Sequence, residues 1–268
     1  MKELQQGYPK LDLHKELLRS NLFIELEKFS NVFINQNKNH MEYYSKKWVA
    51  DPFHWWSREW EYPYVYQEIK KSVSKKHDLN ILDAGSGFTF FPFFISSKYN
   101  RATITCADND KNLKNIFDKI KNDSVSFKYS DITNLQFEDN SFDLIYSISV
   151  LEHFKDYKKA INELNRVLDK DGTLILTFDV SLYGLADMSI KRSKKLIKYL
   201  LKYFKLDNGF DPIYELEIMD VDNLLSIKCP FKDPPLMQKM SSVFKNIIYS
   251  GNFTYHNKMT VFCLSLRN

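Results

Sequence analysis

The sequence has little cysteine and no long apolar run. Its three cysteines, Cys106, Cys229 and Cys263, are scattered, and no pair has CxxC spacing. This scarcity argues against a disulfide framework and against a zinc site, and it favours a reducing compartment. No apolar run reaches the roughly 18 residues of a membrane span, and the N-terminal segment lacks the apolar region of a secretory signal. We therefore expect a cytoplasmic location without membrane association.

Glycine is also scarce, and charges of the two signs are nearly balanced. There are seven glycines, and the net charge of +4 is too small to predict a nucleic-acid partner. A hydrophobic content of 44% with 27% charged residues is typical of a globular chain. The length suits one large domain, or one domain with a smaller cap. The pattern GxxxxGK[ST] does not occur, which excludes a P-loop nucleotide site.

Strand-like and helix-like segments alternate between residues 80 and 180. Strands are expected at ILDA, ATITCA, SVSFKY, FDLIYSISV and TLILTF, and helices at KNLKNIFDKI and DYKKAINELNRVL. Such alternation predicts a parallel sheet covered on both faces, and right-handed crossovers favour a doubly wound strand order. The predicted fold class is α/β, a doubly wound, mostly parallel Rossmann-like sheet preceded by a helical cap.

The predicted limits divide the chain into a cap and a sheet domain. Residues 1–75 should form a helical cap or lid, because hydrophobic residues recur at helical spacing over 11–33 and strand signals are few. Pro63 is expected to precede a helix that starts YVYQEI. Residues 76–268 should form the sheet domain, with a substrate-side insertion at about 181–257 whose elements the sequence does not place. The closing run MTVFCLSL is expected at the sheet edge.

A glycine turn follows the first predicted strand. Gly85 and Gly87 permit close backbone approach at a strand–helix junction, where N–H groups point toward a ligand. Three acids accompany the turn: Asp83 just before it, Asp108 at the end of the second strand, 23 residues after Gly85, and Asp131 after the third strand. GxG alone also occurs in ordinary turns, so the acids carry the prediction of a ligand with ribose hydroxyls.

The runs ILDAGSG, CADND, YSDIT, FDLIYSISVLEH and RVLDKDGTLILTF, in this order, resemble a class I S-adenosylmethionine-dependent methyltransferase. The resemblance covers roughly residues 80–180 and implies S-adenosylmethionine as cofactor and S-adenosylhomocysteine as product. It implies that the glycine turn holds the methionine part of the cofactor. The implied cofactor residues are Gly85 and Gly87 in the turn, Asp83 orienting the turn or the amino group, Asp108 at the ribose, Asn109, Asp131 and Ile132 at the adenine, and Ser147 near the sulfonium.

Two positions help to distinguish an S-adenosylmethionine site from sites for other ligands of Rossmann-like folds. Thr89 stands where the family often has a third glycine. Phe90 stands where a nicotinamide dehydrogenase prefers a small residue for close helix–strand packing. The methyltransferase reading is therefore favoured over a dinucleotide site.

A base for a hydroxyl acceptor must follow the fourth or fifth strand, because the crevice lies at the carboxyl ends of the strands. His153 and Asp179 satisfy this condition. The alternative for His153 is a structural role, as in the family's LEH run, and the alternative for Asp179 is to bind substrate or cap a turn. Some relatives with EH at this point bind a divalent metal through an acid three residues before the glutamate. That position is Ser149 here, so no metal is expected.

Aromatic residues concentrate in the run DPFHWWSREWEYPYVY, residues 51–66. By resemblance this segment is a lid over cofactor and substrate. Arg58 would bind the cofactor carboxylate or an anionic acceptor, and Tyr62 and Tyr64 would donate to the acceptor or face the sulfonium. The alternative is a packing segment in which Arg58 pairs with Glu59 or Glu61. The run WSREWEYPY is also loosely similar to methyltransferases of bacterial surface-polysaccharide pathways.

A lysine-rich helix is predicted over residues 190–206. Its lysines fall on one narrow face, at positions 191, 194, 195, 198, 202 and 205. A solvated outer face is the simplest interpretation, with an anionic acceptor site or a membrane surface as alternatives.

The predicted activity is methylation of an oxygen of a small sugar-type, nucleotide-linked or phosphorylated metabolite in surface-glycan (capsule) synthesis. One alternative is N-methylation of an amine acceptor. A second alternative is a non-catalytic, cofactor-binding partner of another methyltransferase. The oligomeric state is left open.

Overall fold

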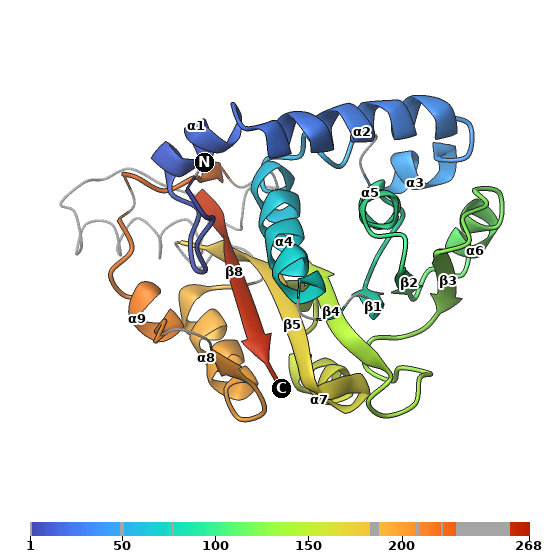
Figure 1. Cartoon of the computed structure of the whole chain (residues 1–268). Coiled ribbons are helices and arrows are strands. Elements are labelled where there is room, and N and C mark those ends of the chain that lie inside the picture. Colours follow the sequence, from blue (N-terminus) through green and yellow to red (C-terminus); the bar gives the residue numbers. More distant parts are fainter. Residues whose placement is uncertain are drawn as a thin grey trace, which may run out of the picture.

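The chain folds around a single twisted sheet (Figure 1). The structure, a computed structural model, describes residues 2–48, 51–74, 76, 78–182, 188–206, 209–220, 222–228 and 258–268. Its strands are β1 (Leu79–Ala84), β2 (Ala102–Asp108), β3 (Val125–Tyr129), β4 (Phe142–Ile148), β5 (Leu168–Ser181), β6 (Lys205–Leu206), β7 (Ile227–Lys228) and β8 (Lys258–Arg267). Its helices are α1 (Leu11–Leu17), α2 (Asn21–Asn37), α3 (Glu42–Lys47), α4 (Arg58–Val73), α5 (Phe91–Lys98), α6 (Leu113–Phe117), the 3₁₀ turn η1 (Leu151–His153), α7 (Tyr157–Val167), α8 (Ile190–Leu200) and α9 (Pro212–Glu215).

The strand order confirms the predicted fold class. Within the described residues the order is β3-β2-β1-β4-β5-β8-β6, and β7 also pairs with β8. The pairs from β3 to β5 are all parallel. The chain moves from β1 outward to β2 and β3, then returns to β4 on the other side of β1. The carboxyl ends of β1 and β4 therefore form a topological switch point, where ligands of open α/β sheets bind.

The closing strand does not lie at the sheet edge, which corrects the sequence prediction. β8 runs antiparallel to β5 on one side and to β6 and β7 on the other. Its central residues Val261–Leu264 are completely buried. The two-residue strands β6 and β7, which cover β8, come from segments in which no strand was expected.

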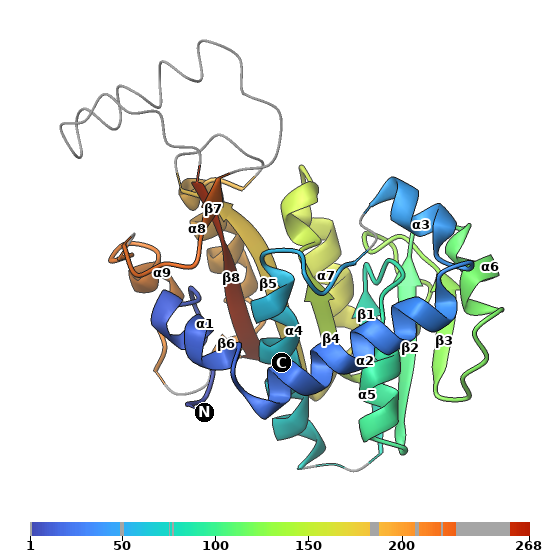
Figure 2. The ribbon, with the colours of Figure 1, turned by 90° about the horizontal axis from the view of Figure 1, so that it is seen from above.

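Helices cover both faces of the sheet (Figures 1 and 2). On one face α2, α4, α5 and α6 share a hydrophobic cluster with β1, β2 and β4. On the other face α7, α8 and α9 share a second cluster with β4, β5 and β8. Figure 2 shows α2 running across α4 and α5. The aromatic run after the glycine turn becomes α5, whose phenylalanines are buried between the sheet and α2 and so hold the turn against the core.

The N-terminal helices differ in their limits from the sequence expectation. The predicted helix over 11–33 is two helices, and Ser20 begins the second by accepting a hydrogen bond from the Phe23 amide at 3.1 Å. α4 begins at Arg58, and Pro63 lies inside it instead of preceding it. A proline costs about 3 kcal/mol or more inside a helix. Burial of Trp60 and Tyr64, at 1% and 0% exposure, outweighs that local preference.

The last third of the chain is only partly described. The predicted helix over 190–206 ends as α8 at Leu200 and is followed by β6. Predictions for residues 183–187, 207–208, 221 and 229–257, which include Cys229 and nearly half of the insertion, lie outside the described residues. Across the described residues, no helix combines the length and the apolarity needed to cross a membrane.

Candidate active site

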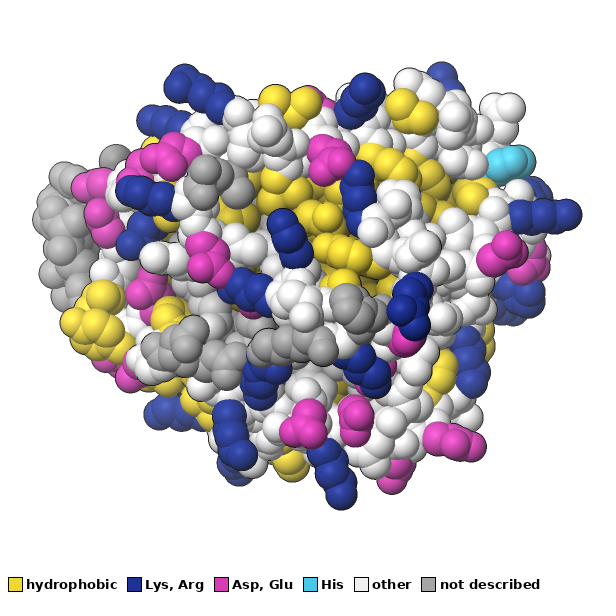
Figure 3. Space-filling view, viewed as in Figure 1, with side chains coloured by type: hydrophobic (Ala, Val, Ile, Leu, Met, Phe, Trp, Pro, Cys, Tyr) yellow, Lys and Arg dark blue, Asp and Glu magenta, His cyan; other side chains and the backbone are white. Residues whose placement is uncertain are grey.

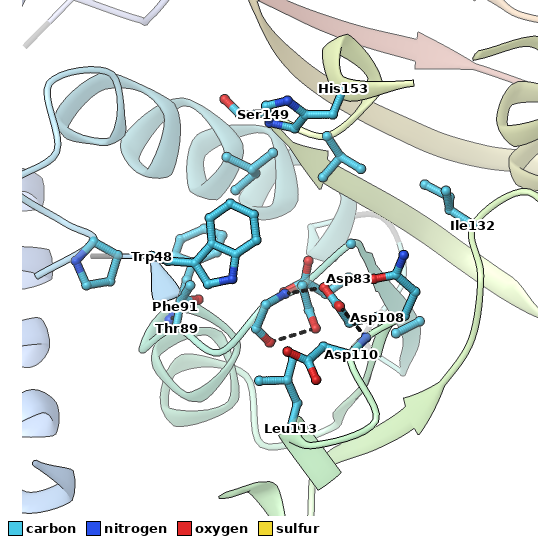
Figure 4. A pocket seen from close by; sticks show the side chains of 18 of the residues that line it. Trp48, Asp83, Thr89, Phe91, Asp108, Asp110, Leu113, Ile132, Ser149 and His153 are labelled. Carbon is cyan, nitrogen blue, oxygen red and sulfur yellow. Dashed lines mark hydrogen bonds between the residues drawn. The ribbon is translucent and has the colours of Figure 1, made fainter. Parts of the chain in front are cut away.

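A cavity of about 530 Å³ lies at the carboxyl ends of β1 to β5 (Figure 4). The cap side of its wall comes from α3, the segment after it and the start of α4. The sheet side comes from the loops that follow the parallel strands. The polar, aromatic and glycine residues of the lining include Tyr44, Lys47, Trp48, Trp55, Arg58, Tyr62, Asp83, Gly85, Gly87, Asp108, Asn109, Asp110, Ser149, His153 and Asp179, and Ile132 lines the cavity as well.

Both glycines of the turn are required by their surroundings. Gly85 has φ +78°, and a Cβ there would lie 2.6 Å from Cγ2 of Val150. Gly87 has φ +53°, and a Cβ there would overlap the hydroxyl of Tyr44 and lie 3.1 Å from its Cζ. Left-handed backbone and lack of space exclude other residues at both positions. The second contact also shows that α3, which carries Tyr44, covers the glycine turn directly.

Asp108 joins the glycine turn to the loop after β2. One carboxylate oxygen accepts from the Gly87 amide at 2.9 Å, and the other accepts from the Asp110 amide at 2.9 Å. Asp110 in turn accepts from Tyr43 at 3.0 Å and from Lys47 at 2.8 Å, both on α3. Figure 4 shows Asp83, Asp108 and Asp110 close together on one side of the cavity, with Trp48 reaching in from the cap. The cap is thus fastened to the acidic wall of the cavity.

Asp83 is a buried acid in this wall. It is 5% exposed and accepts a hydrogen bond from the Tyr146 hydroxyl at 3.0 Å. Burial raises the pKa of Asp83 to about 8, Tyr146 opposes the rise, and the nearby charge of Asp108 adds to it. No cationic side chain of the described residues pairs with it. The site therefore offers a carboxyl group that a bound cation would ionise.

The other end of the cavity holds a hydrogen-bonded cluster at the tips of β4 and β5. Nη1 of Arg58 donates to Glu61 and, at 2.7 Å, to the Ser149 hydroxyl. The hydroxyls of Ser149, at 2.8 Å, and of Thr177 both donate to Glu61. Ser149 has φ +51°, a strained value for a residue with a side chain. Its amide donates to the Thr177 carbonyl at 3.0 Å, and this helps to hold the strained backbone.

Asp179 faces the cavity beside this cluster. Its Oδ1 is buried and has no hydrogen-bond partner in the described part of the chain. Burial, and then the charge of Glu61, raise the pKa of Asp179 to about 7, while Arg58 opposes the rise. Its amide donates to Glu152 at 3.1 Å, and burial and the charge of Asp179 raise the pKa of that 2% exposed carboxyl well above its usual range. An acid that titrates near neutrality can act as a general base.

Most of the residues predicted from the sequence meet in this cavity. Ten of them line it: Arg58, Tyr62, Asp83, Gly85, Gly87, Asp108, Asn109, Ile132, His153 and Asp179. Asp131 and Ser147 do not line it. The Asp131 carboxylate accepts from the amide and hydroxyl of Thr133, both at 2.8 Å, and the Ser147 hydroxyl donates to the Ala84 carbonyl at 2.7 Å. Their contacts with the cofactor thus remain predictions, and neither side chain forms part of the cavity wall.

The two interpretations of residues 51–66 prove to be compatible. Tyr62 is 3% exposed and packs at 4.7 Å from the Phe91 ring, and Trp60 is buried, so α4 is a packing element. Trp55 is 39% exposed, and it lines the cavity together with Trp48, which is 59% exposed. Arg58 pairs with Glu61 and yet keeps 20% of its side chain exposed. One segment therefore both packs on the sheet and forms the cavity mouth.

The lysine-rich helix stays away from the cavity. No residue of α8 lines the cavity, and Lys194 pairs with Glu217 of the surface at 2.7 Å. Lys191, Lys195 and Lys198 are exposed. On the face shown in Figure 3, basic and acidic side chains lie among one another. This arrangement agrees with the solvated-face interpretation.

The cap residues were missed by sequence reasoning. Tyr44, Lys47 and Trp48 lie on or beside a short helix that has no motif, and Glu61 was considered only as an ion-pair partner. One sequence signal for the contact with the cap lies in the run CADND. Asp110, which binds Tyr43 and Lys47 of α3, follows the predicted ribose acid Asp108 by two residues. No group of His, Cys, Asp and Glu side chains in the described ranges is arranged to hold a metal ion.

Comparisons with known proteins agree with this geometry. A family profile described as "Methyltransferase domain" matches residues 82–176. An uncharacterized protein of Methanocaldococcus jannaschii is 31% identical over 194 residues, which cover 68% of this chain and 81% of that protein. A phosphoethanolamine N-methyltransferase of Plasmodium falciparum is 28% identical over 116 residues, 41% of this chain and 43% of the enzyme.

Among solved structures, one assigned to a sarcosine dimethylglycine methyltransferase of Galdieria sulphuraria shares the fold. Its TM-score is 0.50 at 19% identity, covering 77% of this chain and 84% of that chain. The switch point, the glycine turn with its acids and the family match lead to one assignment. The chain belongs to the class I S-adenosylmethionine-dependent methyltransferases.

Proposed function

We propose that the enzyme methylates an oxygen of a small metabolite, with Asp179 as the general base. The observation that carries this proposal is the buried, unpartnered Oδ1 of Asp179 at the cavity wall. Its pKa, raised to about 7, lets the carboxylate exist at neutral pH and still accept a proton. His153 lines the same end and is exposed, and it is the second candidate base.

The cavity fits S-adenosylmethionine, which supplies an electrophilic methyl group when bound. Asp83, a buried acid without a cation, suits an ammonium group. Each oxygen of Asp108 already accepts one amide and retains a second acceptor position for a ribose hydroxyl. The proposed cofactor residues are therefore Asp83, Gly85, Gly87, Asp108, Asn109 and Ile132, with Arg58 and Tyr62 closing the wall.

The cavity mouth supports a ring-shaped, polar acceptor. Trp48 and Trp55 are exposed there, and an indole offers a flat apolar face with one polar N–H. Lys47 lies beside Trp48, with Nζ 5.6 Å from the ring centroid, and its ammonium, which already binds Asp110, has further N–H donors for an acidic group. A sugar-type acceptor that is nucleotide-linked or phosphorylated has a ring to pack on the indoles and an acidic group to bind Lys47. A place in surface-glycan synthesis rests only on the loose resemblance of the WSREWEYPY run.

Residues 1–75 act in this proposal as a lid that excludes water. Tyr44 covers the glycine turn, Lys47 fastens α3 to Asp110, and Arg58 links α4 to the strand tips. Exclusion of water strengthens the electrostatic interactions around the reacting atoms. A hydroxyl acceptor held between the mouth and the tip of β5 would give its proton to Asp179.

The test is turnover with labelled S-adenosylmethionine and a panel of sugar nucleotides, sugar phosphates and amines. The ¹³C shift of the transferred methyl group separates oxygen from nitrogen products. Asp179→Asn should lower kcat at least about a hundredfold, the usual contribution of a general base. Asp169→Asn, at the other end of β5, is the matched control and should leave kcat unchanged. Full activity of Asp179→Asn would exclude Asp179 as the base.

An amine acceptor is the second candidate. Three buried or nearly buried carboxyl groups, Glu61, Glu152 and Asp179, surround the acceptor end, and Arg58 is the cation that faces them. A cationic amine would reduce this excess of negative charge. In that case the labelled methyl group appears on nitrogen, and Asp179→Asn raises KM more than it lowers kcat.

A further inference from the structure

A single carboxylate connects the cap helix with two strand tips. Glu61 lies near the start of α4, and its residue is 0% exposed. One oxygen accepts from Arg58, and the other accepts from the hydroxyls of Ser149 and Thr177. The donors come from α4, from the residue after β4 and from β5. The buried carboxylate therefore has donors on both oxygens, and two of the three donors, Arg58 and Ser149, line the cavity.

Such an arrangement is costly if its only purpose is to pack the helix. A buried ion pair loses much hydration energy, and apolar residues of similar volume often give equal or greater stability. Moreover, Arg58 feels the charges of both Glu61 and Asp179, yet its hydrogen bonds in the described structure go to Glu61, Ser149 and Ser57. The carboxylate that lines the cavity is the one left without the guanidinium.

We propose that Glu61 is a positioning residue for methyl transfer, which holds Arg58 on the cap side so that Asp179 stays unpaired and free to accept a proton. The proposal rests on the proposed role of Asp179 as base. Without Glu61, Arg58 would turn to Asp179, and an opposite charge at hydrogen-bond distance favours the ionised carboxylate. Asp179 would then be a weaker base.

The groups of the described structure that face Asp179 come from α4, η1 and β8. Glu61 and Arg58 face it from α4, and Glu152 and His153 approach from η1. On the far side, β8 places Val261 opposite Asp179. Glu152 binds the Asp179 amide and not its carboxylate. Within the described residues, Arg58 is therefore the cation whose position decides whether Asp179 is paired.

The test compares Glu61→Gln with a matched control on the same helix. Glu68 is also buried, at 7% exposure, but it pairs with Lys71 three residues later and not with Arg58. The pKa of Asp179 is measured by ¹³C NMR on protein labelled at the aspartate carboxyl carbon, with Asp179→Asn to assign the signal. Glu61→Gln should lower this pKa by about one pH unit or more. Glu68→Gln should leave it unchanged.

A second variant separates the effect of the Glu61 carboxylate's position from the effect of its charge. Glu61→Asp keeps the negative charge but is too short to bind Arg58 and both strand hydroxyls together. The proposal expects a lowered Asp179 pKa here as well, and the smaller change protects against loss of the fold. An unchanged Asp179 pKa in either folded variant overturns the proposal, whatever happens to activity.

The pH dependence of activity tests the role of Asp179 as base separately from the role of Glu61 as positioning residue. If Asp179 is the base, kcat rises with pH through its pKa, and this rise should move to lower pH in Glu61→Gln by the same amount as the NMR value. A lowered NMR pKa with an unmoved pH–rate profile would support the hold of Glu61 on Arg58 and would overturn Asp179 as base.

Discussion

Binding of the cofactor product should release a proton from Asp83. The pKa of this buried acid is raised to about 8, so roughly nine-tenths of the molecules carry the proton at pH 7. If the ammonium of S-adenosylhomocysteine docks there, its charge favours the carboxylate and the proton leaves. We expect release of roughly 0.9 proton per site at pH 7, and affinity that rises about tenfold from pH 6 to pH 7.

Titration calorimetry in two buffers with different ionisation enthalpies measures the number of protons released. Asp83→Asn should bind more weakly and release no proton. Asp179→Asn should release the same number as the wild type, because the charge of Asp179 is not among those that shift the pKa of Asp83. Zero release together with an affinity that is flat between pH 6 and pH 7 would refute the placement of the ammonium at Asp83.

Three further predictions concern stability and the cap. The folded-state pKa of Asp83 lies above its unfolded value of 3.8, so this group makes the fold less stable as pH rises from about 4 to 8. Asp83→Asn should therefore raise Tm more at pH 8 than at pH 5 in thermal melts. Gly87→Ala should lower the free energy of unfolding by about 2 kcal/mol in urea titrations, because a left-handed alanine alone costs about 1–2 kcal/mol. Adding Tyr44→Phe should recover part of the loss, since it removes the clashing hydroxyl, and no recovery would contradict the contact. S-adenosylhomocysteine should slow hydrogen exchange in residues 42–47, and Lys47→Ala, which frees α3 from Asp110, should reduce that protection. Equal exchange with and without ligand would argue against a lid.

The residues around the glycine turn could be predicted to meet in one cavity because they sit in local patterns. A buried strand, a glycine turn and an acid at the next strand end are all short-range features, and their order along the chain fixes their order at the sheet edge. Asp131 and Ser147 show the limit of this method. Both follow the pattern, but each side chain turns to a backbone or hydroxyl group nearby and away from the cavity.

The acceptor end could not be read in the same way. Glu61 meets Ser149 and Thr177 across 88 and 116 residues, and no periodicity links these positions. Tyr44 reaches Gly87 from a short helix with no motif. Pro63 pointed to a later helix start because local preference was the only guide, whereas tertiary burial of Trp60 and Tyr64 decides the outcome. Long-range packing was thus the missing information.

The two ends of the cavity use buried acids in different ways. At the proposed cofactor end, Asp83 has no cation of the described chain, so a bound ligand would have to supply the charge that ionises it. At the acceptor end, the described chain supplies Arg58 but directs it to Glu61, and Asp179 remains raised in pKa. A carboxylate that is already paired holds its charge at low pH but accepts protons poorly. The separation of Arg58 from Asp179 therefore leaves a carboxyl group that titrates near neutrality, as the proposed base requires, at the cost of a buried ion pair that stabilises the fold little.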